Sequence, residues 1–238
     1  MDTAPVGVAP PSWRPEPTAA SSDDEAARFD ARAVSRPATA FTGDFYFTAR
    51  TPAGFWFAVG DFAGHGLRAA VFSAMIQEKL ESLVRSRPCS PEDVVAALDR
   101  MLRREIPGNR FASLVVGRAM SSGAVELVNA GHCPPIVART NGEMELIGSH
   151  GPIVGLAPGP RWRPETGDLA PGDRVGLYTD GLIEAEDETG EPFGLDRLVA
   201  LLRISPPETP LETFLSAASR FSGDRQSDDV TLFVLTRC

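Results

Sequence analysis

Aspartates stand next to four strongly apolar segments of the chain, and this residue type at these places could bind a cation. The residues are Asp44, Asp61, Asp180 and the pair Asp228 and Asp229. Aspartate is a poor strand former, so its repeated place between a strand and a turn needs a cause. Solvated turn residues are the ordinary explanation. Cation binding is the other, because a carboxylate at the end of a buried strand is costly unless its charge is compensated.

The run 55–66 is the segment around which the chain is organised. Phe55, Phe57 and Val59 alternate with two further apolar residues, so both faces are apolar, which predicts a strand buried on both sides. The strand ends at Asp61 and leads into a glycine-rich turn, whose carbonyl groups could face the same ion as the carboxylate. Taken alone, the run fits a structural, helix-capping aspartate equally well.

A second predicted strand, 44–49, precedes this one and is joined to it by turn residues at 51–54. The hairpin places Asp44 opposite Asp61. We expect all the aspartate-bearing strands to be central in one core, where clustered carboxylates repel one another unless cations are present. Carboxylate sites suit Mg²⁺ or Mn²⁺. Two such ions sharing an aspartate lower the pKa of a bound water and bind phosphoryl oxygens.

The remaining apolar patterns predict the elements that position these residues. Helices are predicted at 67–85, from 91 to 102, around 195–202 and from 209 to 221, and further strands at 29–33, 111–116, 125–129, 135–138, 144–146, 175–179 and 230–235. The stretch 111–148 is interpreted as one antiparallel meander, and 148–164 as a long loop. Capping boxes are predicted for Ser90 with Asp93 and for Thr209 with Glu212.

Composition and charge narrow the function classes. The formal net charge of −9 over 238 residues argues against nucleic acid or an anionic membrane as a partner. Three cysteines without a C-x-x-C spacing argue against a disulfide framework or zinc site and indicate a reducing, cytoplasmic location. No signal peptide or membrane span is apparent. Residues 1–25 are predicted to be a flexible Pro/Ala/Ser-rich tail, and 26–238 one domain.

At this point the residues match a family. The matching motifs, in order, are Gly43-Asp44-Phe45-Tyr46, Val59-Gly60-Asp61 with Gly64-His65-Gly66, Asn129-Ala130-Gly131-His132-Cys133-Pro134-Pro135, Tyr178-Thr179-Asp180-Gly181-Leu182-Ile183-Glu184-Ala185 and Asp228-Asp229-Val230-Thr231. The chain resembles the bacterial SpoIIE/RsbU-type serine phosphatases, a branch of the PP2C-like (PPM) metal-dependent phosphatases. Five motifs in the family's order make the resemblance specific, where any one would be weak.

The resemblance implies an α+β fold, a four-layer α-β-β-α sandwich of two antiparallel sheets flanked by helices. It also implies two Mn²⁺ or Mg²⁺ ions bridged by Asp61. The other implied ligands are Asp44 and the backbone carbonyl of Phe62 on the first ion, and Asp180 and Asp228 on the second, with Asp229 able to stand in for Asp228. A water bridging the ions would attack phosphoserine or phosphothreonine, without a covalent enzyme intermediate.

The chain departs from the family pattern at a few positions. Thr42 stands where a second glycine is usual, and Phe47 where many members carry an acid. Ala63 occupies the place of the histidine that eukaryotic relatives use as a proposed general acid. His65, typical of the bacterial branch, is a candidate catalytic residue whose proton-donor role is left open. Arg36 and Arg68 are only candidates for a phosphate-binding arginine.

Three functions are weighed. The first is a protein serine/threonine phosphatase acting on a phosphorylated regulatory protein, which by analogy is a STAS-type anti-sigma-factor antagonist in a partner-switching pathway. Its regulation would come from homodimerisation or a separate activator. The second is a catalytically silent PP2C-fold binding module, against which the intact aspartates argue. The third is a hydrolase of small phosphoesters, for which the sequence marks no pocket.

Overall fold

The computed structural model describes residues 29–64, 66–105, 110–148, 151–156 and 162–238. Its strands form two five-stranded sheets, in which every pair of neighbouring strands is antiparallel. The predicted tail 1–25 lies outside the described residues. In the described part of the chain, no helix is long and apolar enough to cross a membrane.

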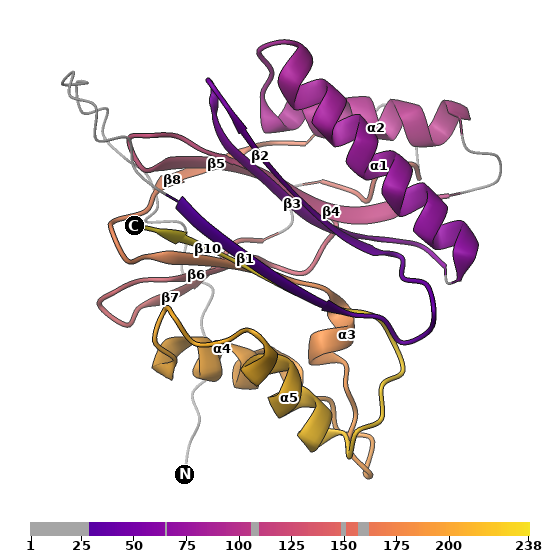
Figure 1. The fold of residues 1–238 in the computed structure, drawn as a ribbon, viewed down its shortest axis with the longest axis vertical. Helices are drawn as coiled ribbons and strands as arrows, with labels where there is room; N and C mark the ends of the chain where they lie inside the picture. Colours follow the sequence, from indigo (N-terminus) through magenta and orange to yellow (C-terminus); the bar gives the residue numbers. More distant parts are fainter. Residues whose placement is uncertain (1–28, 65, 106–109, 149–150, 157–161) are drawn as a thin grey trace.

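The two sheets lie face to face (Figure 1). Sheet A has the order β1 (Phe29–Arg36), β10 (Val230–Arg237), β9 (Arg174–Tyr178), β6 (Ile136–Ala138) and β7 (Met144–Leu146). Sheet B has the order β2 (Asp44–Thr51), β3 (Gly54–Phe62), β4 (Ala112–Ala119), β5 (Ala124–Ala130) and β8 (Glu165–Asp168). Among the described residues, the first strand, β1, pairs with the last, β10, along its whole length, so sheet A joins segments from both ends of the domain.

Helices cover the outer face of each sheet (Figure 1). On sheet B lie α1 (Leu67–Ser86) and α2 (Pro91–Glu105), and on the sheet A side lie α3 (Asp180–Ile183), α4 (Gly194–Ile204) and α5 (Glu212–Phe221). This is the predicted four-layer α-β-β-α sandwich, and the fold class is confirmed.

A buried apolar layer between the sheets joins them. Phe57 and Val59 of β3 face it from sheet B, and Phe233 of β10 meets them from sheet A. The rings of Phe57 and Phe233 stack at a centroid distance of 6.1 Å. Alternate residues of β3, such as Trp56 and Ala58, pack instead under α1 and α2. The prediction of a strand apolar on both faces is confirmed, and the physical reason is that helices and a second sheet cover β3.

One prediction about the strands is wrong, and one strand has no prediction. The stretch 111–148 is not one meander, because the chain leaves sheet B after β5 and enters sheet A at β6. Gly131, at the crossing, has φ 68°, and a Cβ there would lie 2.4 Å from Ile153. The strand β8 was also not predicted, because its sequence Glu165-Thr166-Gly167-Asp168 has no apolar alternation. It forms by pairing along β5.

The two predicted capping boxes have different outcomes. At α2, the Asp93 amide donates to Ser90 Oγ (3.2 Å) and the Ser90 amide donates to Asp93 Oδ2 (3.0 Å), so this box is confirmed. At α5 the box is wrong, since the helix begins at Glu212 and has no side-chain capping hydrogen bond. Leu211, the residue before α5, is buried in the core instead, which indicates that packing sets this helix start.

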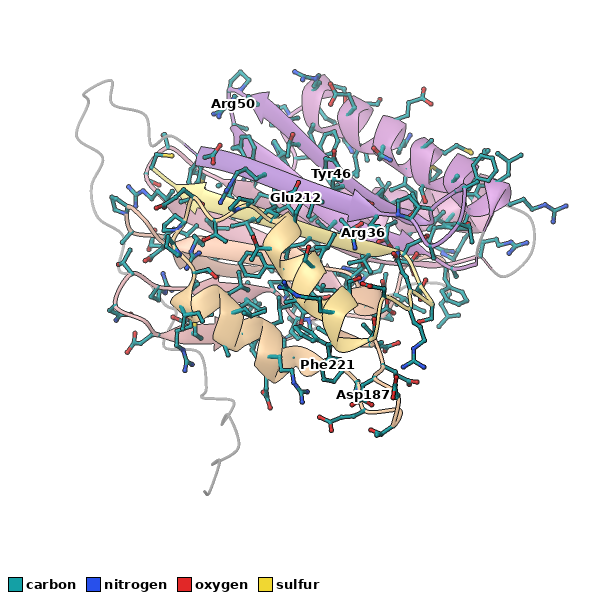
Figure 2. The ribbon with its side chains drawn as sticks, turned by 60° about the horizontal axis from the view of Figure 1, so that its bottom comes forward. Arg36, Tyr46, Arg50, Asp187, Glu212 and Phe221 are labelled. Atoms are coloured by element: carbon teal, nitrogen blue, oxygen red, sulfur yellow. The ribbon has the colours of Figure 1, made fainter. Side chains whose placement is uncertain are left out.

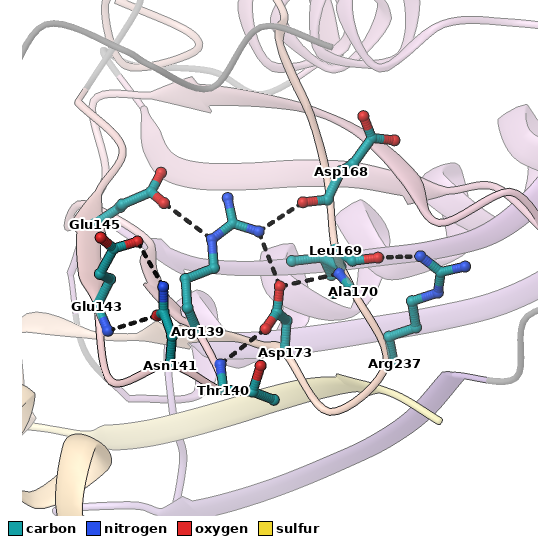
Figure 3. Close-up of polar contacts among 10 residues, drawn as sticks. All are labelled: Arg139, Thr140, Asn141, Glu143, Glu145, Asp168, Leu169, Ala170, Asp173 and Arg237. Atoms are coloured by element: carbon teal, nitrogen blue, oxygen red, sulfur yellow. Dashed lines mark hydrogen bonds and ion pairs between the residues drawn. The ribbon is translucent and has the colours of Figure 1, made fainter. Parts of the chain in front are cut away.

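A buried ion pair fixes the end of the sandwich where β6, β8 and β9 come together (Figure 3). The Asp173 carboxylate is only 3% exposed and accepts hydrogen bonds from the Arg139 guanidinium (3.0 Å), the Thr140 amide (2.9 Å) and the Ala170 amide (2.9 Å). Burial by itself would raise the pKa of Asp173, but these donors outweigh it and hold the pKa below its usual value. The carboxylate therefore stabilises the folded chain in its charged form.

We expect Asp173→Asn to lower the free energy of unfolding at pH 7 by about 2 kcal/mol, as for the loss of hydrogen bonds to a buried charge. Because the folded pKa lies below the unfolded value, the charged form stabilises the fold above the unfolded pKa, and this contribution disappears as pH falls through the folded pKa. Urea unfolding at pH 7 and near pH 3 measures the difference. Asp168→Asn, at an exposed carboxylate on β8, is the matched control. A difference between wild type and Asp173→Asn that does not shrink at low pH would contradict the interpretation.

Candidate metal centre

The hairpin of β2 and β3 brings two aspartates together as predicted. Asp44 is the first residue of β2 and pairs directly with Asp61, the penultimate residue of β3. Directly opposed residues of an antiparallel pair project from the same face, so both carboxylates lie on the side that faces sheet A. Gly43 allows this approach: a Cβ there would lie 2.7 Å from the Phe62 carbonyl oxygen and 2.9 Å from Asp61 Oδ1.

Asp44 is the more enclosed of the two and binds across the sandwich. Its Oδ2 accepts hydrogen bonds from Thr179 Oγ1 (2.8 Å) and Thr231 Oγ1 (2.7 Å), and both threonines are fully buried. Thr179 follows β9 and Thr231 lies in β10, so a carboxylate of sheet B is bound by two residues of sheet A. The Thr231 amide also donates to Thr179 Oγ1 (2.8 Å), which fixes the two donors relative to each other.

The expectation that every aspartate-bearing strand is central is wrong for β2, which is an edge strand of sheet B. Asp44 is nevertheless only 6% exposed. Helix α1 and strand β10 both pack against β2 and shield it from solvent. The site therefore depends on this covering and not on a central place in the sheet.

Burial and mutual repulsion act on both carboxylates. Burial raises the pKa of Asp61 to about 7, with further increases from the negative charges of Asp180, Asp228 and Asp229. Burial also raises the pKa of Asp44 to about 7, against the opposing effect of its two threonine donors, and Asp61 and Asp229 raise it further. The neighbouring charges that raise these two pKa values are those of other aspartates. A cation is what would stabilise both in their ionised form.

Asp180 and Asp228 come from sheet A. Asp180 is the first residue of α3, directly after β9 and Thr179, and Asp228 precedes β10. Gly181 lets the two segments meet, because a Cβ there would lie 2.1 Å from the Asp229 carbonyl oxygen and 3.2 Å from Asp228 Cβ. Asp228 is exposed and Asp180 partly so, which leaves both accessible to an ion or substrate.

Asp229 has a different position from its neighbour. Its Oδ1 accepts a hydrogen bond from the Ala38 amide (2.7 Å) and its Oδ2 accepts one from the Gly43 amide (2.9 Å). Both oxygens thus bind the backbone of the segment 37–43, which leads into Asp44. This carboxylate positions that segment in the structure.

The donor set fits hard divalent cations. Carboxylates and the Phe62 carbonyl are oxygen ligands, which Mg²⁺ and Mn²⁺ prefer. Within the described residues, no group of three or more His, Cys, Asp or Glu side chains is arranged closely enough to hold a metal ion. The fit therefore rests on the chemistry of the donors and on their uncompensated charge, not on a finished coordination shell.

The histidines have separate outcomes. His65, the candidate proton donor, lies outside the described residues, as does His150. His132 is buried, its Nδ1 lies 2.7 Å from Ser113 Oγ, and burial lowers its pKa to about 4. Ser113 pairs directly with Asp61 in the β3–β4 register, so His132 packs beneath the aspartate cluster as a neutral core residue.

The comparison with known protein families gives a clear result. The family described as "Stage II sporulation protein E (SpoIIE)" matches residues 51–237, which is most of the chain. The chain belongs to the SpoIIE family. The SpoIIE/RsbU-type, PP2C-like resemblance stated from the motifs is confirmed at the level of the family.

Relatives and solved structures agree with this. The SpoIIE-family chain is 24% identical to "Phosphoserine phosphatase RsbU" of Bacillus subtilis (strain 168), over 87% of this chain and 63% of the relative. It is 26% identical to "Protein IcfG" of Synechocystis sp. (strain ATCC 27184 / PCC 6803 / Kazusa), over 86% of this chain and 37% of that protein. The chain thus spans less than two thirds of the length of these relatives.

Two solved structures share the fold. The SiaA-PP2C domain of Pseudomonas aeruginosa has a TM-score of 0.76 at 21% identity and covers 87% of this chain and 85% of its own. The RsbU and RsbW domains of Rv1364c from Mycobacterium tuberculosis have a TM-score of 0.72 at 26% identity, over 88% of this chain and 60% of theirs. These likenesses confirm the PP2C fold for the SpoIIE-family domain.

Sequence reasoning missed the two threonines that bind Asp44. Thr179 and Thr231 stand inside the quoted motifs, one residue before Asp180 and two residues after Asp229. A threonine in a strand is ordinary, because β-branched residues favour strands, so its type alone carries no signal. The one sequence signal for their role is that a threonine stands close to the candidate metal-binding aspartates in two separate motifs.

We expect Thr231→Val to weaken Mn²⁺ binding by the SpoIIE-family domain about tenfold or more, because Asp44 loses a donor that holds it in place, worth about 1.5–3 kcal/mol. Calorimetric titration with Mn²⁺ measures this. Thr236→Val, five residues further along the same strand and opposite Asp30 instead of the site aspartates, is the matched control and should bind Mn²⁺ as wild type does. Equal affinities for the two folded variants would show that the threonine does not support the site.

Proposed function

We propose that the chain is a protein serine/threonine phosphatase that uses two Mn²⁺ or Mg²⁺ ions to hydrolyse phosphoserine or phosphothreonine. The observation that carries the proposal is the gathering of Asp44, Asp61, Asp180 and Asp228 at one end of the sandwich, where burial and the negative charges of the neighbouring aspartates raise the pKa of Asp61. Membership of the SpoIIE family supports it, as does the name of the relative RsbU, a phosphoserine phosphatase.

In this proposal Asp61 would contribute to both ions. Asp44 and the Phe62 carbonyl would hold the first ion, and Asp180 and Asp228 would hold the second. The ions, when bound, supply a water of lowered pKa and neutralise phosphoryl oxygens. RsbX, a fold relative with a TM-score of 0.65 at 16% identity, was solved in complex with magnesium, which supports an ion of this class.

Asp228 is preferred to Asp229 as the ligand. Both oxygens of Asp229 already accept backbone hydrogen bonds, at 2.7 and 2.9 Å, from the segment before Asp44. One oxygen of Asp228 accepts the Asp229 amide at 2.8 Å, and the carboxylate is exposed towards solvent. Asp229 therefore positions the segment, and Asp228 keeps ligand capacity.

The aspartates and threonines described above hold and orient the site. Cys133 is a partly buried thiol close enough to Asp180 and Glu184 to be affected by their charges, and burial together with these charges raises its pKa to about 12. A thiol with so high a pKa stays protonated and is a poor nucleophile. This supports attack by water without a covalent intermediate. His65 as proton donor stays a prediction.

The substrate and setting are proposed from the relatives. RsbU and a structure that joins RsbU and RsbW domains are named after partner-switching proteins, which supports a phosphorylated STAS-type anti-sigma-factor antagonist as the substrate. Regulation by homodimerisation or a separate activator belongs to the same proposal. Three free cysteines, Cys89, Cys133 and Cys238, support a cytoplasmic location. The phosphatase domain is proposed to span 26–238.

We expect Mn²⁺-dependent release of phosphate from a phosphoserine protein, and a loss of more than about 100-fold in Asp61→Asn and in Asp180→Asn. A change to an outer residue of a metal site already costs about 10–100-fold, and a direct ligand should cost more. Asp168→Asn, an exposed carboxylate outside the site, is the control and should keep wild-type activity. Activity that survives in both Asp61→Asn and Asp180→Asn would show that this metal centre does not catalyse the hydrolysis.

We expect Asp228→Asn and Asp229→Asn to differ in kind. Asp228→Asn should keep wild-type stability and lose Mn²⁺ affinity, because it removes an exposed ligand. Asp229→Asn should lower the free energy of unfolding by about 1–3 kcal/mol, because an amide cannot accept both backbone hydrogen bonds equally well. Urea unfolding without metal and Mn²⁺ titration of each variant separate the two roles. The reverse pattern would reassign the ligand to Asp229.

A further inference from the structure

A pocket lies directly beside the metal centre, on the sheet A side. It is bounded by the end of β1, by α3, by the C-terminal half of α5 and by the segment 222–230, it is open to solvent, and its cavity volume is about 30 Å³. Its lining includes Arg36, Gly181, Leu215, Ser219, Arg225 and Ser227. Figure 2 labels Arg36 at the end of β1 and Phe221 at the end of α5. Arg36 is also a candidate phosphate-binding arginine, and the proposed hydrolysis assigns no role to the other lining residues.

The floor and the rim of the pocket differ in chemistry. Leu215, Ala218 and Val230 are buried and form an apolar floor. Arg36 and Arg225 are exposed and stand in the rim with polar neighbours. A side chain with a short apolar stem and an anionic end would match both parts.

Neither arginine of the rim forms an ion pair with a carboxylate in the part of the chain that the structure describes. Arg225 Nε donates a hydrogen bond to the Ser222 carbonyl at 2.9 Å. The backbone carbonyl of Arg36 accepts a hydrogen bond from Gln226 Nε2 at 2.8 Å. Other arginines are paired with carboxylates, as Arg118 is with Glu126 and Arg197 with Glu191. Still other described arginines also lack an ion pair, so what distinguishes Arg36 and Arg225 is their shared place at a pocket beside the metal centre.

The pocket and the metal centre share a wall. Gly181 lines the pocket and follows Asp180, and Ser227 lines it and precedes Asp228. Gln226 Nε2 also donates to the Asp228 carbonyl at 3.0 Å, which ties the rim to the segment that carries the ligand. Because each of these lining residues is the sequence neighbour of a proposed ligand, a substrate chain with its phosphoserine at the metal centre would reach this pocket within a few residues.

We propose that this pocket binds a carboxylate side chain of the protein substrate, one to three residues from the phosphorylated serine or threonine. The inference rests on the proposed phosphatase function and adds a sequence preference to it. Guanidinium groups bind carboxylates through paired hydrogen bonds, and the apolar floor accepts the methylene groups of a glutamate. The pocket thereby selects acidic sequences around the phosphosite, although the protein itself is acidic.

The test uses the full chain with Mn²⁺ and phosphoserine peptides that carry one glutamate at each position from three before to three after the phosphoserine. Each peptide has a partner with glutamine in place of glutamate. We expect kcat/KM to be about tenfold higher for the glutamate peptide at one or two positions. Arg225→Gln and Arg36→Ala should abolish this preference. Arg220→Ala, at an exposed arginine of α5 outside the pocket lining, should retain it.

Two further readouts separate this inference from the function on which it rests. Turnover of para-nitrophenyl phosphate reports the metal centre alone and should be unchanged in Arg225→Gln. Anisotropy of fluorescein-labelled peptides reports binding without turnover, so the glutamate preference is measured even if wild type hydrolyses nothing. A wild type that is inactive but still binds glutamate peptides through Arg225 would refute the phosphatase proposal and keep the pocket.

The proposal is overturned if wild type shows no preference for glutamate at any position, or if the preference persists in Arg225→Gln and Arg36→Ala. It is also overturned if Arg225→Gln slows the small ester as much as the peptides, because the guanidinium would then serve the scissile phosphoryl group. Inhibition by inorganic phosphate should be the same in wild type and Arg225→Gln. Loss of that inhibition would assign the pocket to free phosphate instead.

Discussion

The hydrogen bonds from Thr179 and Thr231 to the carboxylate of Asp44 are the constraint on which the acidic end of the molecule depends. They join an edge strand of one sheet to two inner strands of the other, in a place where both threonines are fully buried. A buried carboxylate needs such donors, since its desolvation is otherwise uncompensated. With Asp44 fixed in this way, its carboxylate has a defined position opposite Asp61 in the hairpin. The two carboxylates then form the sheet B side of the proposed metal site.

The backbone around this link is fitted to it. Gly43 lets the Phe62 carbonyl and Asp61 approach the strand start, and Gly181 lets α3 approach the segment that carries Asp228. Asp229 holds the segment before Asp44 through two backbone amides. Acidic side chains thus have two different tasks here. Asp44 and Asp61 are held close together in spite of their mutual repulsion. Asp229 instead accepts backbone hydrogen bonds with both of its oxygens and so holds the segment that leads into Asp44.

The sequence was sufficient for those features that local pattern and motif order determine. The buried strand ending at Asp61, the hairpin with Asp44, the capping box of α2 and the family itself are all confirmed. What it did not supply arises from contacts between distant segments. Strand β8 has no apolar pattern of its own, and Leu211 enters the core where a capping box was expected. The roles of Thr179 and Asp229 depend on partners more than a hundred residues away, which no local spacing encodes.

The central claim is that these aspartates hold two divalent ions that share Asp61. Crystals grown with Mn²⁺, measured at a wavelength where manganese scatters anomalously, test it most directly. The account predicts two anomalous peaks, with Asp61 reaching both, Asp44 and the Phe62 carbonyl on one side, and Asp180 and Asp228 on the other. No peak at saturating Mn²⁺, or peaks bound by residues that do not include Asp61, would contradict it.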